Sequence, residues 1–207
     1  GRAIGLQDRI LLSFAESNWR AQGDDNSVIM ITYTQSHTRR DTLADMIELH
    51  KLALRLMSAD HAYKPLRAEY GFRHHVRGLE DTWGDVSGWH VHSHEMAFCT
   101  QKITPAQGAE LRSKLAKIWQ RMVKKAGRAL VRKALREGDS GRAERLGEVY
   151  ANYQNGIDVK HDRADIADYI AKQGDIESQL RNITQGAADA EEPRPEVGDL
   201  SAELAFT

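Results

Sequence analysis

The stretch GWHVHSHEMAF restricts what the chain can fold into, because it alternates regularly between two kinds of side chain. His90, His92 and His94 occupy alternate positions, and two apolar residues follow at the next alternate positions. Successive side chains of a β-strand point to opposite faces of the sheet, whereas a helix repeats about every 3.6 residues. The stretch therefore predicts a strand that presents three imidazoles on one face.

The residues before this strand predict a hairpin. The Gly-containing segment WGDVSG is typical of a turn, and YGFRHHVRGLEDT before it is typical of a partner strand. Glu80 lies on that partner strand, where its side chain is expected to face the histidines, while Asp81 is expected to point to the other face. Neutral imidazoles beside a carboxylate on a rigid strand form a suitable site for a divalent metal.

For a single histidine, partial burial with a hydrogen bond to the backbone is the more common explanation. Three alternating histidines opposite a carboxylate favour a metal site instead, with His92, His94 and Glu80 as ligands and His90 as a further candidate. A metal alone does not define the reaction, because it could activate water, polarise a phosphoryl oxygen or hold structure.

The remaining pattern predicts an α+β fold with an antiparallel sheet. A strand rich in β-branched residues is expected over residues 27–34, a helix over 41–60 with Asp41 as its N-cap, and a helix that begins at Pro105. The segment EGDSGR should interrupt the helical region, and DRADIADYIAKQ should resume it. Residues 145–160 are compatible with either a strand or a loop.

Composition and charge narrow the class of protein. The 207 residues suit one domain, and they contain no signal peptide and no apolar run of the roughly 20 residues that a membrane span needs, so we expect a soluble cytoplasmic protein without a membrane partner. Cys99 is the single cysteine, which excludes an internal disulfide and agrees with a reducing compartment.

The net charge of −1 conceals two regions of opposite charge. Between Arg112 and Arg145 there are twelve lysines or arginines and three acids, whereas residues 187–207 contain six acids and one arginine. The basic region could follow a phosphate backbone, or it could be an ordinary solvated helix face. The acidic tail contains little with which to build a core, and we expect it to be flexible.

A candidate nucleophile lies in DIADYIAKQ. Asp165, Tyr169 and Lys172 follow one another at intervals of four and three residues, so on a helix they share one face. A tyrosine hydroxyl is a poor nucleophile at neutral pH, but a nearby cation such as Lys172 favours its ionised form. The alternatives are a surface tyrosine that packs beside an ordinary lysine, or nucleophilic attack by Tyr150 or Tyr153.

Four segments, VIMITYTQSH, HVRGLEDTWG, GWHVHSHEMAF and IADYIAKQ, occur in the order of the motifs of plasmid rolling-circle replication initiators. In their order and spacing over residues 27–173, these segments resemble the HUH endonucleases. Conjugative relaxases, which are similar, carry their tyrosine before the histidines, so the order here favours an initiator.

The resemblance implies a role for each candidate residue. His92 and His94 correspond to the metal-binding pair, Glu80 to the carboxylate that completes the site, and Tyr169 to the nucleophile, accompanied by Lys172. Asp165 occupies the position of an acidic residue, usually Glu, that acts in the terminating cleavage. Ser93 departs from the pattern, because the residue between the two histidines is usually bulky and hydrophobic.

The resemblance also implies a fold and an activity. The fold would be an antiparallel sheet backed by helices, of the ferredoxin-like or RNA-recognition type, with the nuclease domain over residues 1–185 and the acidic tail over 186–207. The activity would be a site-specific DNA endonuclease and strand transferase with Mn or Mg as its divalent metal. It would nick a single-stranded or hairpin origin through a 5′-phosphotyrosine intermediate and later religate the strands.

The implied partners are origin DNA and a host helicase and polymerase. Trp83 and Trp89, beside the hairpin turn, would stack on bases or pack in the core. Two rival functions remain open. One is a catalytically inactive DNA-binding module that contains a structural metal, and the other is a cupin-like metalloenzyme.

Overall fold

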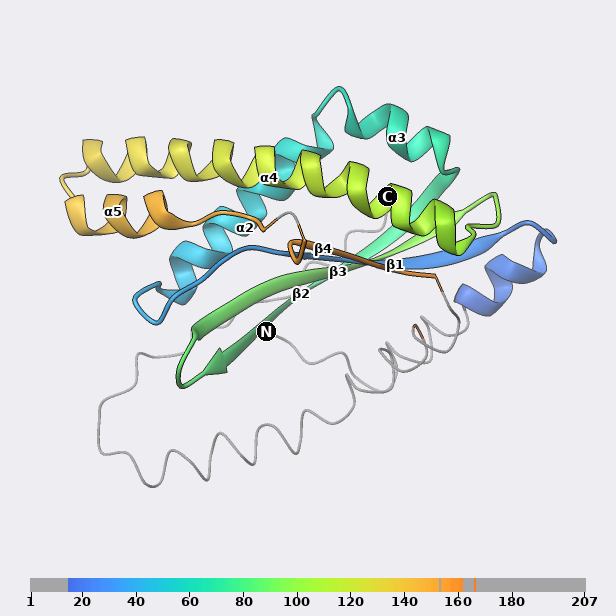
Figure 1. The fold of residues 1–207 in the computed structure, drawn as a ribbon, viewed down its shortest axis with the longest axis horizontal. Coiled ribbons are helices and arrows are strands. Elements are labelled where there is room, and N and C mark those ends of the chain that lie inside the picture. Colours follow the sequence, from blue (N-terminus) through green and yellow to red (C-terminus); the bar gives the residue numbers. More distant parts are fainter. Residues whose placement is uncertain (1–14, 153, 162–165, 167–207) are drawn as a thin grey trace.

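The computed structural model describes residues 15–152, 154–161 and 166, which form an α+β fold with a four-stranded antiparallel sheet backed by helices (Figure 1). The predicted fold class is therefore confirmed. In chain order the elements are β1 (Ser27–Thr34), α2 (Leu43–Ser58), α3 (Tyr63–Glu69), β2 (Phe72–Gly84), β3 (Gly88–Cys99), α4 (Pro105–Arg136), α5 (Ser140–Glu148) and β4 (Ile157–Lys160). The strand order is β2-β3-β1-β4, which is the split β-α-β arrangement of ferredoxin-like folds.

The two central strands are β1 and β3, and the hairpin predicted around residues 70–100 is confirmed. Within it, Glu80 pairs with His92 and Trp83 with Trp89. The turn ends at Gly88, whose φ is +79°. A Cβ there would lie 2.7 Å from the Arg39 Cα, so only glycine fits.

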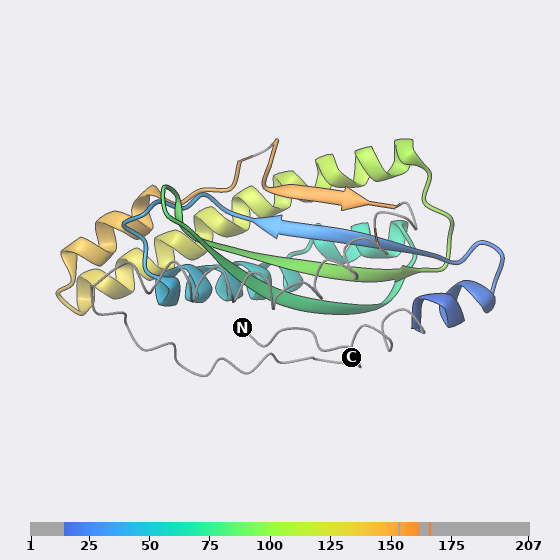
Figure 2. The same ribbon diagram turned by 90° about the horizontal axis from the view of Figure 1, so that it is seen from below.

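One face of the sheet carries the main core. Side chains at most odd-numbered positions of the central strands, such as Ile31 of β1 and Val91 of β3, are fully buried beneath α2 and α4. From α4, Trp119 contributes a buried ring that packs against Tyr33, and its Nε1 donates to the Thr34 carbonyl at 2.6 Å. Helices α2 and α4 therefore cover one face of the sheet, and the opposite face is not part of this core (Figure 2).

The opposite face is divided along its strands. At one end it carries a second apolar cluster, formed by Val28, Met30, Met96, Phe98 and Ile166. A helical segment over residues 15–21 packs on this cluster through Trp19, whose Nε1 donates to the Cys99 carbonyl at 3.0 Å. The other end of the same face carries the histidines.

The helix ends show how local chemistry sets the boundaries. Asp41 is not the N-cap of α2, contrary to the prediction. Thr42 caps the helix by accepting from the Asp45 N–H, while the Asp41 carboxylate accepts from the N–H and hydroxyl of Thr38. Helix α4 does begin at Pro105, and a capping box between Thr104 and Gln107 precedes it.

Residues 145–160 contain the short strand β4, so the open choice between strand and loop is decided in favour of a strand that pairs with β1. No helix in the described ranges is both long and apolar enough to cross a membrane. The expected boundary between residues 185 and 186, and the acidic tail, lie outside the described residues.

Candidate metal centre

The hairpin brings Glu80 of β2 together with His92 and His94 of β3. The Nε2 atoms of the two histidines each lie 3.2 Å from the same carboxylate oxygen, Oε2 of Glu80. One ligand atom from each residue lies within 4.8 Å of the others, which is close enough for one cation to contact all three. Three of the predicted ligands are therefore assembled into a site that could hold a metal ion.

The site is open on one side. The histidine side chains retain 13 % and 12 % exposure, whereas Glu80 retains 35 %. A site with two imidazoles and a carboxylate, all from one sheet face, leaves coordination positions for water or substrate. Such an arrangement suits a catalytic site better than a closed structural one.

A neighbouring hydroxyl orients one of the ligands. Thr32 of β1 pairs with His94 across the sheet, and its Oγ1 lies 2.9 Å from Nδ1 of His94. If Nδ1–H donates to this hydroxyl, Nε2 keeps its lone pair for a metal. Nδ1 of His92 is buried and has no hydrogen-bond partner among the described residues.

Electrostatics in the cluster favour the ligand forms. Burial alone would raise the pKa of Glu80, but hydrogen bonds from His92 and His94 outweigh it and hold that pKa well below its ordinary value. The pKa of His94 is lowered, mainly by burial, although Glu80 opposes the shift. An ionised carboxylate and a readily deprotonated imidazole are the forms that bind a divalent cation.

His90 lies outside the cluster, although it shares the same face. Its Nε2 is 2.9 Å from the Thr34 hydroxyl, and its ring stacks on that of His37 with 4.7 Å between centroids. Burial and the charge of His92 lower the pKa of His90 to about 4. Of the three alternating histidines, two form the candidate site, and His90 lies beside it as an uncharged side chain at neutral pH.

Strand β4 contributes polar residues to the same face. Asp158 pairs with Thr32 and Lys160 with Met30, so both follow the row of side chains that contains the histidines. The charge of Lys160 contributes to lowering the pKa of His94. A cation at this position would attract an anionic substrate toward the open side of the site.

Beneath the site lies a chain of buried polar side chains that the sequence pattern did not predict. Ser93, which separates the two histidine ligands, is fully buried, and its hydroxyl lies 2.9 Å from Nε2 of His50. Nδ1 of His50 lies 2.6 Å from Oε1 of Gln35. The serine that departs from the expected bulky residue is thus a hydrogen-bonding position, supplied with a partner by α2.

The predicted tyrosine motif, with Asp165, Tyr169 and Lys172, lies outside the described residues, as does Tyr153. Ile166, three residues before Tyr169, is fully buried in the apolar cluster on the histidine face. Tyr150 is 58 % exposed and lies in the loop that follows α5.

The two tryptophans of the hairpin form a pair near its tip. Their ring centroids lie 5.1 Å apart in an edge-on arrangement, and Trp83 remains 43 % exposed. Trp83 is thus available for contact, while Trp89 is half-buried against it.

No family model, curated protein or solved structure matches the chain.

Proposed function

We propose that the chain is an HUH endonuclease of the rolling-circle replication initiator type, which nicks single-stranded DNA by tyrosine attack. The observation that carries the proposal is the convergence of His92 and His94 Nε2 on one oxygen of Glu80, on an open sheet face. The split β-α-β topology, with the histidines on a central strand, agrees with the fold that the resemblance implies. Ile166, which precedes Tyr169 by three residues in the sequence, is buried on the same face of the sheet as the histidines.

In the proposed reaction, Tyr169 supplies the attacking oxygen. Its hydroxyl loses a proton and forms a bond to the phosphorus, while the bond from phosphorus to the 3′ oxygen breaks and that oxygen takes up a proton. The products are a 5′-phosphotyrosine and a free 3′-hydroxyl. Lys172 would favour the ionised tyrosine, and Asp165 would accept a proton in a second cleavage.

His92, His94 and Glu80 would hold the divalent cation. When bound, this cation would supply positive charge to neutralise the scissile phosphate. Two imidazoles and a carboxylate accept several divalent metals, and availability in cells favours Mg or Mn. Lys160 would attract the DNA phosphate backbone toward the same face of the sheet. The substrate would be a single strand or an extruded hairpin.

The structure bears differently on the two rivals. A cupin-like enzyme needs a double-sheet jelly roll, whereas the described residues form a single four-stranded sheet with helices. An inactive DNA-binding module would use the same metal centre. It differs from the proposed enzyme in one respect, which is that its function would tolerate the replacement of Tyr169.

The test uses labelled single-stranded oligonucleotides that span candidate origins of the protein's own replicon, with Mn or Mg, analysed on a denaturing gel. We expect a covalent protein–DNA adduct that is absent without metal and absent in Tyr169→Phe and His92→Ala. Tyr150→Phe is the matched control and should retain the adduct. DNA binding without any adduct would favour the inactive module, and an adduct retained in Tyr169→Phe would move the nucleophile to Tyr150 or Tyr153.

A further inference from the structure

Most of the basic residues of α4 lie on the side of the helix that faces away from the sheet. Six of them, here called the basic stripe, are Lys117, Lys124, Lys125, Arg128, Arg132 and Arg136, all exposed. They recur mainly at three-, four- and seven-residue spacing, which on an α-helix confines them to about a third of the circumference. The opposite side of α4 is apolar and buried in the core, so the stripe and the candidate metal centre lie on opposite sides of the molecule.

The stripe differs from the other cations of the helix in its partners. Lys114 pairs with Glu69 and Glu110, and Lys133 pairs with Glu48. By contrast, within the part of the chain that the structure describes, no residue of the stripe forms an ion pair or hydrogen bond with an acidic group. Their positive charge is thus not neutralised locally.

Three residues of the stripe line a groove between α4 and α5. Lys124, Arg128 and Arg132 form its charged wall, and its volume is about 350 Å³. The rest of the lining is apolar or glycine: Gly127, Val131, Leu146, Gly147 and Val149. The two helices lie close together here, since a Cβ built on Gly127 would be in van der Waals contact with the Leu146 carbonyl oxygen, at 3.4 Å.

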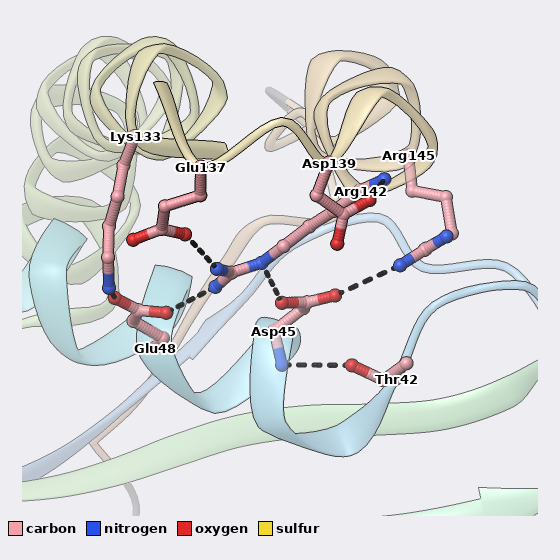
Figure 3. A network of polar contacts seen from close by, with 8 residues as sticks. All are labelled: Thr42, Asp45, Glu48, Lys133, Glu137, Asp139, Arg142 and Arg145. Carbon is pink, nitrogen blue, oxygen red and sulfur yellow. Dashed lines mark hydrogen bonds and ion pairs between the residues drawn. The ribbon is translucent and has the colours of Figure 1, made fainter. Parts of the chain in front are cut away.

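Ion pairs join α5 to α2 (Figure 3). Arg142 of α5 donates to Asp45 at 2.6 Å and to Glu48 at 2.5 Å, both on α2. Arg145 lies 3.5 Å from the other oxygen of Asp45. The arginines of α5 are therefore occupied by acids of α2, while those of α4 that face the groove are not.

We propose that the basic stripe and this groove bind the phosphate backbone of double-stranded DNA, at a second site separate from the metal centre. From Lys117 to Arg136 the helix rises about 30 Å, which matches about nine base pairs of a straight duplex. None of the groove residues is aromatic, so the groove lacks the stacking platform on which single strands are bound. The choice of DNA over RNA rests on the proposed function.

The two sites would have different roles, because the basic stripe would bind duplex DNA and the metal centre would act on a single strand. The duplex held along α4 and the single strand cleaved at the metal centre must be different stretches of DNA, because the sheet lies between the two sites. Binding at α4 is electrostatic, so it should be insensitive to sequence and should weaken steeply with salt.

The test measures fluorescence anisotropy of a labelled 20-base-pair duplex against salt concentration, with EDTA present. We expect Lys124→Gln, Arg128→Gln and Arg132→Gln together to weaken binding roughly tenfold to hundredfold at 0.15 M salt, and to reduce the salt slope by about 2.7. The matched control is Lys114→Gln with Lys133→Gln, which removes the paired lysines of the same helix and should leave the slope almost unchanged. Circular dichroism checks that each variant is folded.

Further arms separate this proposal from the proposed function. His92→Ala and Tyr169→Phe should bind the duplex normally, and the triple variant should still cleave a preformed single-stranded oligonucleotide. Unchanged duplex affinity in the triple variant would overturn the proposal. So would preferential binding of the groove to single strands, to polyglutamate or to vesicles of anionic lipid.

Discussion

Arg77 and Glu95 face each other across β2 and β3 and form an ion pair whose carboxylate is completely buried. The Arg77 Nε donates to Oε2 of Glu95 at 3.0 Å, and the guanidinium lies over the Tyr33 ring. The same pair of strands carries Glu80 opposite His92. The buried ion pair therefore holds the register on which the candidate metal centre depends.

Replacement of Arg77 by Met should destabilise the protein by about 3–5 kcal/mol, because it leaves a buried carboxylate without its partner. Removal of both charges, in Arg77→Met with Glu95→Leu, should restore much of that loss. Urea unfolding followed by circular dichroism measures both values. Equal losses in the single and double variants would show that packing, not the charge pair, dominates here.

Mn²⁺ should stabilise the folded protein, since a cation that binds only the native state adds about 2.7 kcal/mol at a concentration 100 times its Kd. The thermal shift should disappear in Glu80→Ala and His92→Ala. His90→Ala should retain it, because His90 Nε2 faces the Thr34 hydroxyl instead of the cluster. A shift lost equally in His90→Ala would make His90 a fourth ligand.

Thr32→Val should weaken Mn²⁺ binding by roughly 10- to 100-fold, the usual effect of removing a group that orients a ligand. The hydroxyl lies 2.9 Å from Nδ1 of His94, and valine preserves the shape of the side chain without it. Isothermal titration of the folded variant measures the change. Thr34→Val, which faces His90, is the matched control and should have little effect.

His50 should make the protein sensitive to acid. Burial, together with the charges of Arg77 and His92, lowers its pKa to about 3, whereas an unfolded histidine titrates near 6.5. Below pH 6.5 the unfolded chain binds a proton that the folded chain refuses until about pH 3. The free energy of unfolding should therefore fall by up to about 1.4 kcal/mol per pH unit from this group as the pH drops from 6 to 4.

Well above pH 6.5 this contribution to stability is fully present and constant. His50→Gln removes the titrating group, so its stability should fall less steeply between pH 6 and 4 than that of the unsubstituted protein. Urea unfolding at several pH values measures the two slopes. Identical slopes would mean that His50 becomes protonated without unfolding.

Cys99 should resist thiol reagents in the folded state. Its side chain is fully buried, and burial raises the pKa of its thiol to about 12, so almost no thiolate exists at neutral pH. Reaction with a chromogenic disulfide should be slow under native conditions and stoichiometric in urea. Fast native labelling would show that the end of β3 opens readily.

The local patterns of the sequence predicted most of the fold correctly. Alternation predicted the strands of the hairpin, and apolar spacing predicted α2 and α4, because each signal lies within one element. Helix α3 was not predicted. It has seven residues, including Pro65 in its first turn, and contributes only two buried side chains, so its sequence carries little periodic signal.

The candidate site was predictable to the same extent. Glu80, His92 and His94 lie on adjacent strands of a hairpin, so the alternation and the turn together predicted their common face. The exclusion of His90 was not predictable, because it depends on Thr34, which pairs with this region only through the register of β1. The pairing of Ser93 with His50 likewise requires the packing of α2 on the sheet.

The three candidate ligands come from one hairpin, and only eleven residues separate Glu80 from His92. Closing so short a loop costs little chain entropy, so the site can form as soon as the two neighbouring strands pair. A cation held there would cross-link two adjacent strands, and it would form no link between distant parts of the chain. Its binding energy would therefore suppress local opening of β2 and β3 most strongly. The metal would stabilise the hairpin as a unit more than the rest of the fold.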